Sequence, residues 1–175
     1  MTKEGFLDRY NHVRTVEEAL NKSISASVQH NRLYNDVPNE HRFRIRYFWR
    51  EKLQQLSENF NDEQWSEDKY EDEIEKLKYL MNQKFGNLID FRISHSQKSI
   101  SVFFKHLWCL EKIPIPPQCP VDRIILTRAN TPYNERSWGF VNDINTHRRK
   151  YDLIRHAASA AGYQQVSEWE LLNFE

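Results

Sequence analysis

The chain has 175 residues, which is enough for one domain with a proper core, or for a core domain with a helical arm. Its 25 Lys and Arg balance 25 Asp and Glu, so the net charge favours no class of partner. No apolar run approaches the roughly 20 residues needed to span a bilayer, which argues against a membrane partner. Residues 1–6 lack the basic start and long apolar stretch of a signal peptide, so we expect a cytoplasmic protein.

The chain offers few ligands for a cofactor. Cys109 and Cys119 are its only cysteines, too few for a four-cysteine zinc or iron–sulfur site, and we expect both to be reduced and structural. The seven histidines form no i, i+4 pair, and no glycine-rich phosphate loop occurs. We therefore expect neither a metal nor another cofactor.

Helical signals dominate the first half of the chain, and only four glycines occur, which disfavours hairpin-rich folds. Residues 15–18 (Thr-Val-Glu-Glu) form a capping box that opens a helix ending near Asn31. Apolar residues at 3–4 spacing predict further helices from about 40 to 59 and from 66 to about 85.

Residues 87–94 alternate enough to predict a short strand or an extended connector. The most apolar helix follows, from about 96 to 111, and we expect it to be the central core helix. Beyond a proline-rich loop, Asp122 suits the N-cap of a helix at 123–129.

After a loop at 130–139, the pattern predicts a helix from about 142 to 161 and a second capping box at 167–170 that opens a short terminal helix. The sequence thus predicts an all-α fold, a single compact domain over residues 1–175. Within it we expect a helical N-terminal part at 1–86 and a core at 87–175.

Two basic segments are candidates for nucleic-acid contact. On a helix, Arg42, Arg46 and Arg50 form a narrow positive stripe, and arginine forks suit phosphates. The alternative is that this stripe pairs with the acidic face of residues 62–75 in a helical hairpin. Arg148 and Arg149 form a smaller patch whose stems can simply cover apolar surface.

Lys98 and Asp122 are the candidate catalytic residues. They flank a loop made semi-rigid by four of the chain's six prolines. Lys98 is expected in the first turn of its helix, where it is either a solvated lysine or a nucleophile whose pKa is lowered by desolvation. Asp122 is either a helix cap or a carboxylate that stabilises a cationic transition state across a pocket from Lys98.

The run from Ser94 to Phe104, the proline loop and the Pro-Val-Asp at 120–122 resemble the core of the helix-hairpin-helix DNA glycosylases. The resemblance covers residues 94–126 only. It implies that Lys98 is the lysine that forms the Schiff base in bifunctional members, and that Asp122 is the catalytic aspartate. The family's hairpin normally carries two glycines, which are absent here, so the resemblance assigns the contact with the DNA backbone to Ser94, His95 and Ser96.

The same resemblance implies double-stranded DNA as the partner and excision of a modified or damaged base. The target nucleotide would leave the duplex and stack on aromatic rings, for which Trp138, Tyr133 and Trp108 are the candidates. Trp108 has core packing as its other reading. The competing interpretation of the whole chain is a non-enzymatic helical interaction module that binds a protein partner through its charged helical faces.

Overall fold

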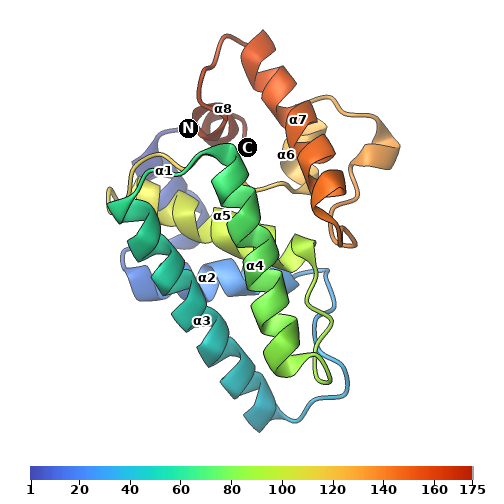
Figure 1. Ribbon diagram of the computed structural model, residues 1–175. Helices are drawn as coiled ribbons and strands as arrows, with labels where there is room; N and C mark the ends of the chain where they lie inside the picture. Colours follow the sequence, from blue (N-terminus) through green and yellow to red (C-terminus); the bar gives the residue numbers. More distant parts are fainter. Residues whose placement is uncertain (175) are drawn as a thin grey trace.

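The computed structural model describes residues 1–174 and folds them into helices, with no β-strand in that range. The all-α prediction is therefore confirmed. The elements, shown in Figure 1, are α1 (Lys3–Phe6), the π-helical turn η1 (Leu7–Asn11), α2 (Val16–Val28), α3 (Asn39–Asp62), α4 (Glu67–Phe85), α5 (Ile93–Cys109), α6 (Arg123–Arg128), the 3-10 turn η2 (Tyr133–Glu135), α7 (Ile144–Ala160) and α8 (Val166–Asn173). None of these helices is long and apolar enough to cross a membrane.

Of the two alternatives predicted for 87–94, the strand is wrong, and residues 87–92 form a connector to α5. The segment makes one isolated bridge, between Tyr34 and Ile89, and α5 already begins at Ile93. The physical reason lies at Phe91, whose backbone N–H and C=O are both satisfied by the side-chain amide of Asn82, at 3.2 and 2.6 Å. A side chain thus takes the place of a partner strand.

The helix caps were partly predictable. The capping box at Thr15 and Glu18 forms as expected, and the Asp122 side chain caps α6. The second capping box is wrong, because α8 begins at Val166 and Gln165 precedes it without a side-chain cap. The Ser167 hydroxyl instead donates to the carbonyl of Pro116, which anchors the proline loop.

Two hydrophobic clusters form the core. The first draws its buried residues from the segment 6–113 together with Leu171, and the second from residues 119–169. In Figure 1, α6 and α7 lie to one side of the bundle that α2–α5 form. Every residue of α5 is buried, which confirms it as the central core helix.

The proline loop at 113–120 connects the two clusters. The Tyr151 hydroxyl donates to the Pro117 carbonyl at 2.9 Å, so α7 also holds the loop. Cys109, before the loop, and Cys119, within it, are both buried and free, as expected for structural thiols. Burial raises the pKa of Cys109 to about 12, so this thiol stays protonated.

Candidate active site

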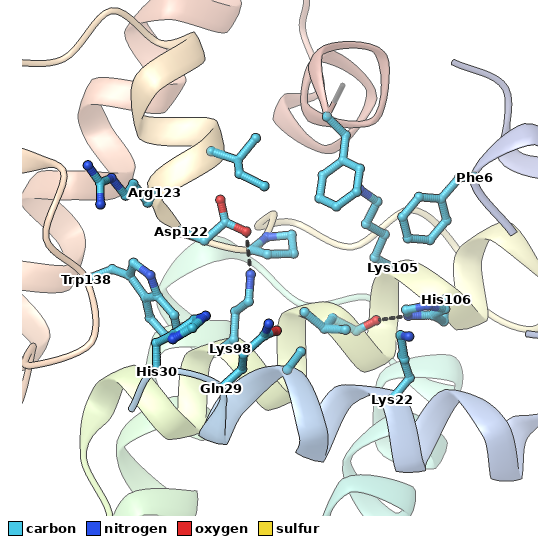
Figure 2. Close-up of a pocket in the computed structure, with 15 residues that line it drawn as sticks. Phe6, Lys22, Gln29, His30, Lys98, Lys105, His106, Asp122, Arg123 and Trp138 are labelled. Carbon is cyan, nitrogen blue, oxygen red and sulfur yellow. Dashed lines mark hydrogen bonds and ion pairs between the residues drawn. The ribbon is translucent and has the colours of Figure 1, made fainter. Parts of the chain in front are cut away.

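A cavity of about 410 Å³ is lined by residues of both clusters and is shown in Figure 2. α5 and α2 each contribute four residues at the spacing i, i+4, i+7 and i+8, which places them on one helix face. These are Lys98, Val102, Lys105 and His106 of α5, and Lys22, Ala26, Gln29 and His30 of α2 and its C-terminal turn. The other walls are Phe6, Phe174, Trp138 and residues at the start of α6.

Lys98 and Asp122 meet on the wall of this cavity. The Lys98 amine donates to one carboxylate oxygen of Asp122, and each residue is only 7% exposed. The other oxygen of Asp122 accepts the Ile125 backbone N–H at 3.0 Å. Asp122 is thus a helix cap, as one of its two predicted roles requires, and it also lines the cavity beside Lys98. Its predicted role in stabilising a transition state stays a prediction.

The neighbouring residue Gln97 fixes this arrangement. Its side-chain amide donates to the Val121 carbonyl at 2.9 Å and accepts the Val121 N–H at 3.2 Å. Gln97 and Lys98, which are consecutive in α5, are therefore hydrogen-bonded to the two residues that follow the proline loop, Val121 and Asp122. Lys98 is the sixth residue of α5, so its predicted place in the first turn is wrong, because the helix begins earlier than expected.

The cavity is electrostatically positive. Burial by itself raises the pKa of Asp122, but the Lys98 ammonium and the Ile125 N–H outweigh it, so the pKa lies below its ordinary value and the group stays a carboxylate. Among the residues that the structure describes, it is the only acidic one that lines the cavity. Lys22 and Arg123 also line it, and neither side chain has a hydrogen bond or ion pair within residues 1–174. Such a site favours anionic ligands.

The far end of the cavity is held by a second buried ion pair. Lys105 lies 2.8 Å from Glu170, and its amine also faces the rings of Phe6 and Phe174, at 4.2 and 3.9 Å from their centroids. Burial raises the pKa of Glu170, and Lys105 opposes that shift without cancelling it. Because its amine is paired with Glu170, Lys105 has a structural role in the cavity wall.

The three aromatic candidates have separate places. Trp138 lines the cavity, with its ring centroid 5.5 Å from the Lys98 amine. Tyr133 is exposed and lines a neighbouring hollow. Trp108 does not line either one; it is buried under the amine of Lys3, which is consistent with its core reading.

Ser94, His95 and Ser96 are fully buried in the first turn of α5, so they present nothing to a DNA backbone. The reason is that each side chain is hydrogen-bonded internally. Ser94 donates to Gly139 and accepts from Asn31; Ser96 donates to Ile74 at 2.6 Å. His95 accepts the Arg92 N–H, and burial lowers its pKa to about 4, so the ring is neutral. Ser94 therefore holds the loop that carries Trp138.

The arginine stripe on α3 has intramolecular partners. Arg50 pairs with Glu17 of α2, Arg46 donates to the Tyr34 hydroxyl and Arg42 to the Val37 carbonyl. The predicted alternative, pairing with the acidic face at 62–75, is not what these contacts show.

The smaller patch is similarly engaged. Arg148 pairs with Glu71, and Arg149 lies 3.4 Å from Glu135. Both arginine side chains remain about half exposed or more, at 47% and 62%.

Sequence reasoning missed the α2 wall. A pattern in the sequence could have indicated it, because Lys22, Ala26 and Gln29 have the same spacing as the cavity-lining residues of α5. The sequence does not show, however, that these two helix faces meet. His30 closes this wall in the left-handed conformation, with φ 57°, which is uncommon for residues other than glycine. Comparisons of the chain with protein-family models, curated proteins and solved structures find no match.

Proposed function

We propose that this protein binds DNA and excises a modified or damaged base in the cavity that Lys98 and Asp122 share. The observation that carries the proposal is the meeting of an amine and a carboxylate, 24 positions apart, on one cavity wall beside an aromatic ring. A volume of about 410 Å³ lies within the range of small-ligand pockets and suits an extruded nucleotide.

The two groups have complementary roles in breaking a glycosidic bond. As the bond between the base and the sugar C1′ breaks, the sugar gains oxocarbenium character, which the Asp122 carboxylate stabilises. The Lys98 ammonium gives its proton to the departing base, and the resulting neutral amine forms a bond with C1′. The sugar ring then opens: the C1′–O4′ bond breaks, O4′ takes the proton that the Lys98 nitrogen loses, and an imine joins that nitrogen to C1′. Trp138 provides a ring on which the extruded base stacks.

A second candidate function rests on a different surface. Phe43 and Tyr47 of α3 are 72% and 57% exposed and line a groove of about 530 Å³ together with residues of α2. Exposed aromatic residues beside a groove favour a protein-interaction module. The two functions separate by salt dependence, since only a DNA binder weakens in proportion to the number of phosphates it neutralises.

The direct test of excision is incubation with single strands and duplexes that bear a panel of lesions and modified bases, with and without borohydride. Borohydride reduces the imine between the Lys98 nitrogen and C1′ to an amine, which leaves a stable covalent complex. We expect base release and trapping with the wild-type protein, and neither with Lys98→Gln. Lys112→Gln, at an exposed lysine outside the cavity, is the matched control and should behave as wild type. Absence of release and trapping across the whole panel would overturn the proposal.

A further inference from the structure

Next to the cavity lies a second hollow of about 380 Å³, here called the loop groove. Its residues come from the end of α2, the start of α6 and the loop 133–140. His30, Arg123 and Trp138 line both the cavity and the loop groove, so the two hollows adjoin. Figure 2 shows these three residues at one end of the cavity.

Two aromatic rings of the loop groove face solvent. Tyr133 is 77% exposed and Phe140 is 78% exposed, so neither contributes to the core. Large apolar side chains left in water beside a hollow indicate a binding surface. The loop is nevertheless held in place, because Ser94 bonds the carbonyls of Gly139 and Val141 through its hydroxyl and its N–H, at 2.8 and 2.9 Å.

The loop groove carries positive charge and no acidic side chain. The side chain of Arg123 has no hydrogen bond or ion pair within the described residues. Arg136 donates through Nε to the Thr131 carbonyl at 3.0 Å, which leaves its two terminal amino groups for a ligand. The guanidinium of Arg92 lies over the Phe140 ring, 5.2 Å from its centroid.

Alternating rings and guanidinium groups suit one class of ligand. Unpaired nucleotides offer flat bases that stack on aromatic side chains and phosphates that arginine forks bind. A paired duplex hides the faces of its bases, so it cannot use Tyr133 and Phe140. An acidic peptide would use the arginines but would leave both rings without a matching partner.

We infer that the loop groove binds the unpaired nucleotide that adjoins the one entering the cavity, so that the substrate is single-stranded or locally unpaired DNA. The base of this nucleotide stacks on Tyr133 or Phe140, and Arg123 and Arg136 hold its phosphates. This inference rests on the proposed function in one respect. The nucleotide in the loop groove is the neighbour of the target nucleotide only because the target base enters the adjoining cavity.

Fluorescence anisotropy with a labelled 12-nucleotide single strand and with the matching duplex tests the inference without requiring catalysis. We expect the single strand to bind more tightly than the duplex. Tyr133→Ala or Phe140→Ala, whichever removes the ring on which the base stacks, should weaken single-strand binding by about fivefold or more, the value of one base stacked on a ring. Tyr79→Ala is the control, because Tyr79 is 63% exposed on α4 and lines neither hollow; it should bind as wild type.

The arginine contribution has its own control on the same helix. Arg123→Ala should reduce the slope of log affinity against log salt by about 0.7, which corresponds to one phosphate of a single strand. Arg128, also exposed on α6, lines neither hollow, and Arg128→Ala should leave the slope unchanged. Equal effects of the two variants would contradict the inference, as would equal binding of duplex and single strand.

The two proposals fail separately. If Tyr133→Ala or Phe140→Ala loses single-strand binding but borohydride traps nothing, the inference about the loop groove is supported and the proposed excision is contradicted. If trapping at Lys98 succeeds while both variants bind as wild type, the proposed excision is supported and the inference about the loop groove is contradicted.

Discussion

Lys98 and Asp122 form an ion pair that joins the two hydrophobic clusters of the protein across a cavity wall. Lys98 belongs to the fully buried helix α5, and Asp122 begins α6 at the end of the proline loop. Each carboxylate oxygen has one task, since one accepts the Lys98 amine and the other caps the helix at Ile125. The two tasks can be separated by substitution.

Asp122→Asn keeps an oxygen for the Ile125 N–H but removes the charge that Lys98 faces. We expect a loss of about 3 kcal/mol in the free energy of unfolding, because breaking a buried pair leaves an uncompensated charge. Asp122→Ala should lose about 1 kcal/mol more, the value of an N-cap. Urea unfolding measures both. Adding Lys98→Met to Asp122→Asn should restore most of the first loss, and no restoration would mean that the charge of Lys98 is not what destabilises the variant.

Gln97 is a positioning residue for the pair. Gln97→Met keeps the side-chain volume but leaves the Val121 N–H and C=O without partners, at a cost of about 1–3 kcal/mol for each buried group. If the proposed excision holds, its rate should fall while DNA affinity stays unchanged, because Asp122 is then less well placed against the sugar. Gln83→Met, at an exposed residue of α4, is the control. A Gln97→Met protein of wild-type stability would show that the two hydrogen bonds between Gln97 and Val121 do not hold this segment in place.

The Lys105–Glu170 pair is expected to be a frame and not a reacting group. Glu170→Gln should destabilise the protein by about 3–5 kcal/mol, since the amine of Lys105 would be left buried without a countercharge. A double variant, Lys105→Met with Glu170→Gln, should recover much of this loss. Thermal unfolding measures the series. If the double variant were as unstable as the single one, packing around residue 170 and not charge would be the cause.

Stability should fall as the pH drops, and His147 offers the clearest test. Burial lowers the pKa of His147 to about 4, against an ordinary value near 6.5. Between these pH values the unfolded chain binds more protons than the folded one, so stability is full above about pH 6.5 and is lost as the pH falls toward 4. At pH 5 the titration of this single group lowers the free energy of unfolding by about 2 kcal/mol.

The comparison uses urea unfolding at pH 7 and pH 5. His147→Gln should shrink the difference between the two pH values by about 2 kcal/mol, because glutamine does not titrate there. His156→Gln changes an exposed histidine of the same helix and should leave the difference as in the wild type. If the difference in free energy of unfolding between pH 7 and pH 5 were the same for the two variants, the pH dependence could not be assigned to the burial of His147.

The sequence by itself determined most of the local elements. Thr15 caps α2 and Asp122 caps α6, because a cap forms between residues of one turn. The all-α fold followed from the same short-range patterns, since apolar periodicity identifies a helix without reference to its partners. The order of Lys98, proline loop and Asp122 was also visible, because it is a property of the chain.

Only the tertiary structure decided which side chains reach a ligand. Ser94 was expected at DNA, yet it is buried because Asn31, 63 positions away, and Gly139 close over it. Lys22 joined the site only because α2 packs against the lysine face of α5. Burial depends on which faces meet, and that choice minimises exposed apolar surface over the whole chain, so no single segment encodes it.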